Sequence, residues 1–324
     1  MPDTERSYGV ALKNFTTYAQ SPDIAEITDY TRRAEQLGFS SAWVWDHILL
    51  GSKRPFPFLE SLSTLAALAP QTTGIRLGTG VLIPTLRNPV VLAKVLSSLD
   101  QISRGRLMVG MAAGWYEKEF EACGVPYERR GQVFLENFEI MRRLWQEDLV
   151  DGEHGKYVFR HAAMLPKPHQ RPGPPVLFGG YVEAVLRRVA RLADGWLTYF
   201  YTAQSFAGSW ARIRNYAESY GRDPNQLISI NQLPICVAPS FEEADRRVGS
   251  FVADYFDVAA WSESTPDSSI RGRPEDCAEQ IRLHLEAGVQ QIVFVPCDYS
   301  LEQLELIATQ VLPLLGTVPG RAAS

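Results

Sequence analysis

One histidine stands where a reacting group is expected. His47 follows Asp46 directly after Ala42-Trp43-Val44-Trp45, an apolar run with the composition of a buried strand. An imidazole titrates near neutral pH, so it can exchange a proton with a substrate carbonyl or a reduced ring nitrogen. We predict that His47 is the catalytic acid–base group. We assign Asp46 to the catalytic site with it, where its carboxylate would orient the imidazole or cap the following loop.

The other histidines and the cysteines suggest no further chemistry. The chain has five histidines and four cysteines, and they form no H-E-x-x-H, H-x-H or C-x-x-C spacing. The cysteines lie far apart, at Cys123, Cys236, Cys277 and Cys297. A disulfide framework or a zinc site would need closer, patterned spacing, so we expect no metal in the mechanism.

Composition narrows the classes of partner. The 324 residues are 45% hydrophobic and 21% charged, and 32 basic residues against 37 acidic ones give a net charge of −5. A nucleic-acid binder would have a basic footprint, which this chain lacks. No apolar run approaches the roughly 18 residues of a membrane span, and the first six residues lack the apolar core of a signal peptide. We therefore expect a cytoplasmic protein with no nucleic-acid or membrane partner.

Short apolar runs alternate with amphipathic stretches from end to end, and this pattern predicts eight strands, each followed by a helix. The predicted strands are 8–12, 42–45, 75–79, 106–111, 175–178, 196–198, 228–238 and 291–295. The predicted helices are 24–37, 59–69, 89–102, a long helix that includes 134–145, and then 185–192, 203–220, 241–255, 274–287 and 301–315. We predict an α/β fold, a (β/α)8 TIM barrel, as a single domain over residues 1–324. A doubly wound sheet is the alternative, but it needs a Gly-rich turn after the first strand, where this chain has Lys13-Asn14-Phe15.

Two connections are too long for simple loops. One covers about 146–174 and is polar and Pro-rich; the other covers about 256–273 and contains Trp261. Segments of this length in a compact fold are often lids, and some are mobile surface loops. The second insertion is the better lid candidate because it precedes the eighth strand, on the side where barrel active sites lie.

The carboxyl ends of the predicted strands carry glycines and aromatic residues. Barrel enzymes bind their ligands at these ends. Glycines there let a flat ligand approach the backbone, and aromatic rings can stack on it. The residues in question are Phe15, Trp45, Thr79-Gly80-Val81, Gly114-Trp115, Gly179-Gly180-Tyr181 and Tyr199-Phe200-Tyr201.

Several motifs, in their order and spacing, resemble the bacterial luciferase-like superfamily. They are Trp43-Val44-Trp45-Asp46-His47, residues 75–84, Arg87-Asn88-Pro89, residues 99–107, Pro175-Val176-Leu177-Phe178-Gly179-Gly180, Ala193-Asp194-Gly195-Trp196, Gly272-Arg273-Pro274-Glu275-Asp276 and Glu286-Ala287-Gly288-Val289. The resemblance covers about residues 8–315. It implies a (β/α)8 barrel that binds FMN or the deazaflavin coenzyme F420 in reduced form, and that transfers hydride or activates oxygen.

The resemblance also implies roles for particular residues. Gly80-Val81, beside Thr79, corresponds to a bulge with a non-prolyl cis peptide on which the cofactor ring rests. Gly114-Trp115 and Gly179-Gly180-Tyr181 correspond to positions near the ribityl chain and phosphate, and His47 to a histidine facing the ring. A helix starting near Val182 would direct free N–H groups at an anion, which is consistent with that placement. We assign Phe15, Trp45, Tyr199 and Trp261 to the substrate pocket.

One position departs from the deazaflavin sugar-phosphate dehydrogenases of that superfamily. Their catalytic glutamate directly follows the fourth-strand glycine; here that position is Trp115, with Glu117 and Glu119 two and four residues on. Basic residues for a substrate phosphate are also not evident near Pro296-Cys297-Asp298. A sugar phosphate is therefore not the expected substrate, and the aromatic strand ends indicate an apolar or aromatic one.

Three functions remain open on the sequence. The first is F420-dependent hydride transfer to or from a small apolar or aromatic substrate, which the single histidine favours because a deazaflavin is a hydride carrier that reacts sluggishly with oxygen. The second is FMNH2-dependent monooxygenation, and the third is a non-catalytic flavin-binding homologue. The expected partners are a small-molecule substrate, a separate flavin or F420 reductase, and a second copy of the chain in a homodimer.

Overall fold

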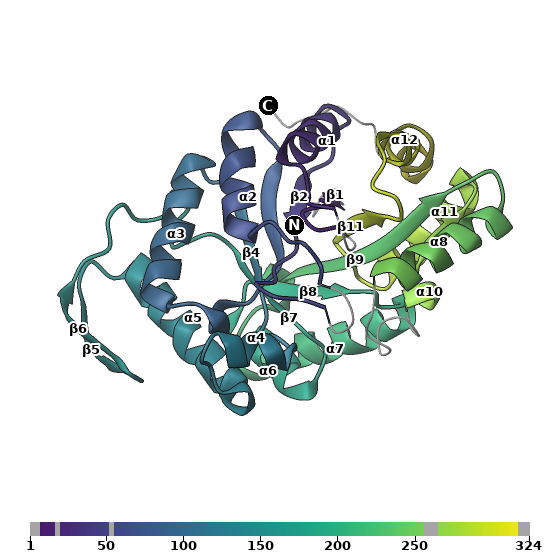
Figure 1. Ribbon diagram of the computed structural model, residues 1–324. Helices are drawn as coiled ribbons and strands as arrows, with labels where there is room; N and C mark the ends of the chain where they lie inside the picture. The colour runs from purple at the N-terminus through teal and green to yellow at the C-terminus, as the bar shows by residue number, and fades with distance from the viewer. Residues whose placement is uncertain (1–6, 17–19, 52–54, 256–264, 317–324) are drawn as a thin grey trace.

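Eight parallel strands close into a barrel in the computed structural model, which describes residues 7–16, 20–51, 55–255 and 265–316 (Figure 1). The pairings of β1 with β11 and of β8 with β9 complete the ring. The barrel strands are β1 (Ser7–Ala11), β2 (Ser41–Val44), β3 (Arg76–Leu82), β4 (Leu107–Met111), β7 (Val176–Gly179), β8 (Gly195–Tyr199), β9 (Ile228–Val237) and β11 (Gln291–Pro296). The predicted (β/α)8 TIM barrel is confirmed.

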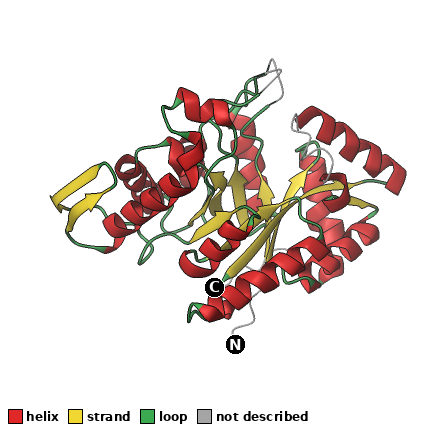
Figure 2. Cartoon of the chain, turned by 90° about the horizontal axis from the view of Figure 1, so that it is seen from below, coloured by secondary structure: helices red, strands yellow, loops and turns green. Residues whose placement is uncertain are grey.

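Helices surround the strands on the outside (Figure 2). They are α1 (Ile24–Gln36), α2 (Ser61–Leu68), α3 (Pro89–Ile102), α4 (Glu117–Ala122), α5 (Arg130–Gln146), α6 (Glu183–Leu192), α7 (Ala203–Ser219), α8 (Phe241–Tyr255), α10 (Thr265–Ser268), α11 (Pro274–Glu286) and α12 (Leu301–Leu306). The predicted bounds of α3 are confirmed. Its first turn is fixed by Asn88, whose side chain accepts hydrogen bonds from the N–H groups of Val90 and Val91. Pro89 fits there because the first helical N–H has no partner inside the helix.

The core has two layers, one between strands and helices and one inside the barrel. Trp43 is the largest side chain of the inner layer and is 1% exposed. It fits because Gly78 on the neighbouring strand has no side chain: a Cβ there would lie 2.3 Å from the indole. Strand alternation thus places large and small residues in register to fill the barrel below the site.

The structure departs from the predicted elements in the first insertion and in the last helix. Residues 146–174 contain an antiparallel hairpin, β5 (Val150–His154) and β6 (Tyr157–Ala162), which projects from the barrel beside α3 and α5 (Figure 1). A short strand, β10 (Ile270–Gly272), extends the sheet beside β9. The predicted helix 301–315 remains α-helical only to Leu306 and continues as a π turn and a 3₁₀ turn. Pro313 accounts for part of this change because it has no N–H to donate.

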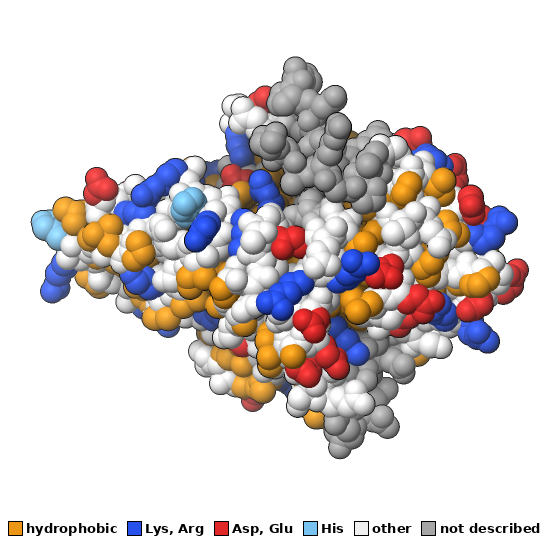
Figure 3. Space-filling view, turned by 90° about the horizontal axis from the view of Figure 1, so that it is seen from above, with side chains coloured by type: hydrophobic (Ala, Val, Ile, Leu, Met, Phe, Trp, Pro, Cys, Tyr) orange, Lys and Arg blue, Asp and Glu red, His pale blue; other side chains and the backbone are white. Residues whose placement is uncertain are grey.

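Surface charge is mixed on the face shown in Figure 3, where basic and acidic side chains are interspersed. Among the described residues, no helix is both long and apolar enough to span a membrane.

Burial of His284 predicts a specific pH dependence of stability. This side chain on α11 is 6% exposed, and burial lowers its pKa from 6.5 to about 4. The unfolded chain therefore binds this proton at a higher pH than the folded chain does. The stabilising contribution is fully present above pH 6.5 and is lost as the pH falls toward about 4. We expect this group to lower the free energy of unfolding by about 2–3 kcal/mol over that window.

Urea unfolding at a series of pH values measures this effect. In His284→Gln the pH dependence between these limits should shrink by the same amount. Identical pH dependence in the two proteins would show that His284 titrates normally in the folded chain.

Candidate active site

A cavity of about 420 Å³ opens at the carboxyl ends of β2, β3, β4, β7 and β8. We call it the first cavity. The predicted site residues that line it are Trp45, Asp46, His47, Gly80, Val81, Gly114, Trp115, Gly179, Gly180, Tyr181 and Tyr199. Because parallel strands end at one rim of the barrel, the turns after five strands meet here although they span 150 residues of sequence.

His47 forms a dyad with a buried carboxylate. Its Nδ1 lies 2.8 Å from Oε2 of Glu119, and the exposed fractions of the two side chains are 12% and 0%. The other oxygen of Glu119 accepts hydrogen bonds from the backbone N–H groups of Ile48 and Leu49, at 2.6 and 2.8 Å. A carboxylate only accepts, so Nδ1 carries the proton and Nε2 is the nitrogen left for a ligand. The carboxylate thus fixes the orientation of the imidazole and leaves Nε2 without a partner in this dyad.

Asp46 has a different partner from the one predicted. Its two oxygens accept hydrogen bonds from the Arg87 guanidinium at 2.7 and 2.8 Å, and also from Ser61 Oγ and the Ile83 N–H. Arg87 bonds Glu60 as well, at 3.0 Å. Burial opposes the charge of Arg87, but Asp46 and Glu60 outweigh it and raise its pKa. The expectation that Asp46 orients His47 is therefore wrong. The hydrogen bonds of the Asp46 carboxylate instead link the end of β2 to the segment after β3 and to the start of α2.

The sequence analysis noted Glu119 but gave it no role. It lies on α4, four residues after Trp115, and α4 is too short to show a periodic face. Trp115 and Phe58 pack edge-on against the His47 ring, with centroid distances of 5.8 and 5.5 Å. The imidazole is thus held between aromatic rings as well as by the carboxylate.

The floor of the cavity is nearly free of side chains. The Gly80–Val81 peptide is cis, which confirms the expectation from the family resemblance. The carbonyl of Gly80 accepts a hydrogen bond from Gln232 Nε2 at 3.2 Å. A Cβ on Gly80 would lie 2.9 Å from the Gln232 amide, and one on Gly179 would lie 3.0 Å from Val81. These glycines leave a cradle that a larger residue would fill.

Two arginines that the sequence analysis missed lie in the first cavity, on α5 and α6. Arg130 and Arg188 line it next to Gly131 and the start of α6. The Arg188 guanidinium lies beside Gly131, 3.2 Å from where a Cβ on that glycine would be. Within the described part of the chain, neither arginine has an ion-pair partner. Arg130 donates to the Tyr127 carbonyl at 3.0 Å and lies over the Tyr127 ring, and Glu128 also lines the cavity. Two guanidinium groups without an ion-pair partner and the first N–H groups of a helix form a site suited to a phosphate.

Three predicted site residues are not placed in the cavity. Thr79 is fully buried, and its hydroxyl donates to the Gly110 carbonyl at 2.9 Å, because alternation turns it away from the side occupied by Gly78 and Gly80. Phe15 stacks on Phe58 and meets Trp45 edge-on, so it supports the cavity from behind. Trp261 lies outside the described residues, as does much of the second insertion, which had been the lid candidate.

The four cysteines are free, and among the described residues no three His, Cys, Asp or Glu side chains are grouped to hold a metal ion.

A family model described as luciferase-like monooxygenase matches residues 7–291. The chain belongs to this family. The resemblance inferred from the motifs is thereby confirmed, and the chain is a member of a family of oxidoreductases and monooxygenases.

Individual relatives extend this family assignment. An F420-dependent glucose-6-phosphate dehydrogenase of Intrasporangium calvum is 29% identical over 89% of this chain and 94% of its own. Monooxygenase RslO1 from Streptomyces bottropensis has the same fold, with a TM-score of 0.82 and 23% identity over 95% of this chain and 99% of its own. A coenzyme F420-dependent tetrahydromethanopterin reductase from Methanopyrus kandleri has a TM-score of 0.78 and 20% identity over 96% of this chain and 99% of its own.

Proposed function

We propose that this protein is an F420-dependent oxidoreductase that transfers hydride to or from a small apolar or aromatic organic substrate. The observation that carries the proposal is one cavity with a His–Glu dyad, a glycine floor and two arginines that have no ion-pair partner among the described residues. F420 in the name of the relative from Intrasporangium calvum, which aligns over most of this chain, supports the choice of cofactor.

The residues present fit a phosphate-bearing flavin or deazaflavin. Arg130, Arg188 and the start of α6 would hold the phosphate ester that F420 and FMN share. The Gly80–Val81 floor and the glycine pair at 179–180 leave room for a flat ring close to the backbone. His47 lines the same cavity and would face the reacting side of such a ring.

The protein's own residues account for the steps other than hydride transfer. When bound, the cofactor supplies or accepts the hydride. His47 Nε2 exchanges the proton that must accompany hydride transfer to a carbonyl or from an alcohol, and Glu119 keeps Nδ1 protonated so that Nε2 stays available. Trp45, Trp115 and Tyr199 border the cavity and exclude water from the reacting groups.

Cofactor titration tests the proposal directly. We expect F420 to bind with a Kd in the micromolar range, a free energy of about −8 kcal/mol. Arg188→Ala and Arg130→Ala should each weaken binding about tenfold or more, since each removes a charge-assisted hydrogen bond worth about 1.5–3 kcal/mol. The matched control is Arg187→Ala, which should leave the Kd unchanged. Arg187 lies on α6 next to Arg188, but it is paired with Glu183 and does not line the cavity. Fluorescence titration measures all four proteins.

An oxygen-free assay distinguishes the remaining alternatives. Turnover with F420 should proceed at the same rate without oxygen. Tight binding of FMNH2, with product formation strictly dependent on oxygen, would instead make the protein a monooxygenase with the same fold and site. Cofactor binding with no turnover on a broad set of alcohols and carbonyl compounds would favour the non-catalytic homologue.

A further inference from the structure

A buried glutamine lies against the floor of the first cavity without lining it. Gln232 is on β9 and is 1% exposed, and its Nε2 donates a hydrogen bond to the Gly80 carbonyl on β3 at 3.2 Å. β9 and β3 are not neighbours in the sheet, so this bond crosses the interior of the barrel. Gly80 lines the first cavity and Gln232 does not. The side chain of Gln232 therefore reaches the site only through Gly80.

The amide of Gln232 packs against the Gly80 backbone. A Cβ on Gly80 would lie 2.9 Å from Nε2, 3.0 Å from Oε1 and 3.2 Å from the amide carbon. A side chain at position 80 would displace the amide, so glycine is the residue that lets this contact form. The contact and the hydrogen bond together fix where the Gly80–Val81 peptide lies.

Burying the Gln232 amide costs free energy that an apolar residue would not cost. Strand alternation places Gln232 on the same face of β9 as Ile230 and Cys236, which belong to the apolar layer inside the barrel. An amide in such a layer is unfavourable unless it is hydrogen-bonded. A leucine would serve for packing alone, so the amide indicates that position 232 supplies the hydrogen bond to Gly80.

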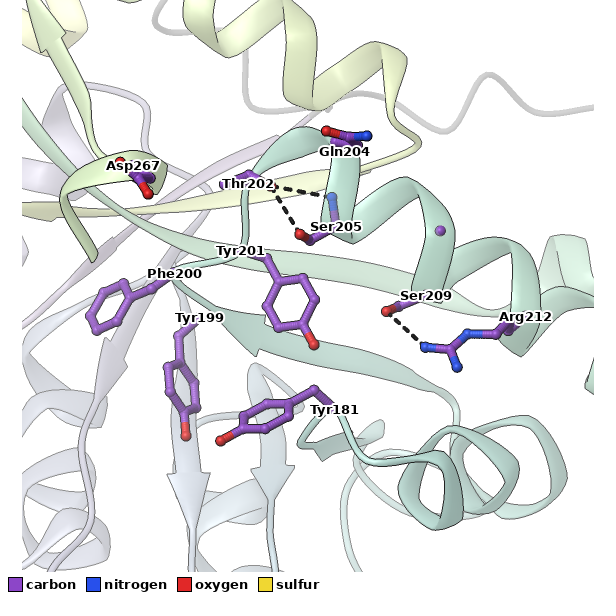
Figure 4. A pocket seen from close by; sticks show the side chains of 11 residues that line it. Tyr181, Tyr199, Phe200, Tyr201, Thr202, Gln204, Ser205, Ser209, Arg212 and Asp267 are labelled. Atoms are coloured by element: carbon purple, nitrogen blue, oxygen red, sulfur yellow. Dashed lines mark hydrogen bonds between the residues drawn. The ribbon is translucent and has the colours of Figure 1, made fainter. Parts of the chain in front are cut away.

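The backbone of Gln232 holds a second part of the site. Its carbonyl accepts a hydrogen bond from the Phe200 N–H at 2.9 Å, and its partner in the β8–β9 register is Tyr199. Phe200 has a φ of 58°, in the left-handed region that residues other than glycine seldom adopt. Tyr199 and Phe200 line a second cavity, of about 800 Å³, at the end of β8, and Tyr199 lines the first cavity as well (Figure 4). Gln232 thus connects the glycine floor on β3 to these aromatic rings on β8.

We propose that Gln232 is a positioning residue, which sets the place of the cofactor ring by holding the Gly80 carbonyl. It acts through the floor of the first cavity and does not touch the ligand. With its carbonyl bonded to Nε2, the Gly80–Val81 peptide keeps one orientation, and a flat ring meets a fixed surface. The inference rests on the proposed function for the identity of the ligand, since a flavin or deazaflavin must be the molecule on this floor.

Two substitutions separate the hydrogen bond from the packing. Gln232→Leu keeps a side chain of similar size that donates nothing. Gln232→Glu keeps the shape: its ionised carboxylate only accepts and so repels the Gly80 carbonyl, whereas the protonated carboxyl can donate to it. Burial raises the pKa of a carboxyl at such a position, so the change of state should fall between about pH 5 and pH 9.

Gln303→Glu is the matched control. Gln303 on α12 is also 1% exposed, and its Nε2 also donates to a backbone carbonyl, that of Val237, at 2.8 Å. It lines neither cavity. This variant therefore reproduces the loss of a buried amide donor at a distance from the floor.

Fluorescence titration gives the Kd for F420 of each variant, expressed as a ratio to the wild-type Kd at the same pH, so that the titration of the ligand and of His47 is common to both. The ratio should be about tenfold or more in Gln232→Leu at every pH, the effect of one lost hydrogen bond. In Gln232→Glu it should be as large near pH 9 and fall to about threefold or less near pH 5, where the carboxyl donates. In Gln303→Glu it should stay near one. A role confined to stability would not produce this recovery at low pH.

A ratio near one in Gln232→Leu would overturn the proposal. A ratio in Gln232→Glu that is the same at both ends of the pH range would also overturn it, as would an equal loss of affinity in Gln303→Glu. If Gln232→Glu does not fold, the ratio in Gln232→Leu decides. The proposed function fails separately, if the wild type binds FMN and not F420, in which case the same ratios are measured with FMN; a wild type that binds neither would overturn both.

Discussion

His47→Ala should lower turnover with F420 by about 10²–10⁴-fold, the range for loss of a general acid–base group. The Kd for F420 should change little, because the floor of the first cavity and its arginine pair are untouched. Steady-state rates of F420 reduction or F420H2 oxidation measure the first quantity, and fluorescence titration measures the second. Turnover at the wild-type rate would remove His47 from the mechanism.

Two further variants connect this effect to the dyad. Glu119→Gln should also lower turnover, because the glutamine amide can donate to Nδ1 and so place the imidazole proton on Nε2. His161→Ala is the control: this histidine lies on the projecting hairpin with its side chain 82% exposed, and its loss should leave the rate unchanged. Equal losses in His47→Ala and His161→Ala would point to a general defect and not to proton transfer.

Asp46→Asn should lower the free energy of unfolding by about 3–5 kcal/mol, the cost of breaking a buried ion pair by removing one partner. The carboxylate side chain is fully buried and the Arg87 side chain is 15% exposed, so the remaining guanidinium is left without its closest counter-charge. Urea unfolding followed by circular dichroism measures the change. Asp46→Asn/Arg87→Gln should recover part of the loss, because it removes the second charge as well.

An exposed ion pair provides the comparison for that result. Arg33 and Glu305 lie 2.7 Å apart with side chains 40% and 48% exposed. Solvent screens such a pair, so Glu305→Gln should cost less than about 1 kcal/mol. If Asp46→Asn costs no more than Glu305→Gln, the Asp46–Arg87 pair does not hold the strand ends together.

Elements with a regular apolar period were predictable from the sequence to within a few residues. α3 and α8 have the predicted bounds, and β9 differs from its prediction by one residue at its end. The β5–β6 hairpin was missed because its strands are short and mostly exposed, so alternation leaves little apolar signal. The end of the 301–315 helix was missed because a change of hydrogen-bond register leaves the apolar spacing nearly unaltered.

The sequence by itself determined the barrel, the rim at which the site forms, and most of the residues that line it. These follow from local periodicity: the alternation of strands and helices fixes the topology, and the topology brings the strand ends together. The glycines and aromatics after β3, β4, β7 and β8 could therefore be assigned to one site without knowing any distance within it.

Only the tertiary structure decided which charged side chains form pairs. Asp46 and His47 are adjacent in sequence, yet their partners are Arg87, 41 residues away, and Glu119, 72 residues away. Arg130 and Arg188 likewise come from different helices. An ion pair depends on separations of a few ångströms between side chains set by distant backbone segments, and no local pattern encodes those separations. The sequence thus located the histidine that we propose as the acid–base group, and the fold supplied the carboxylate beside it, Glu119.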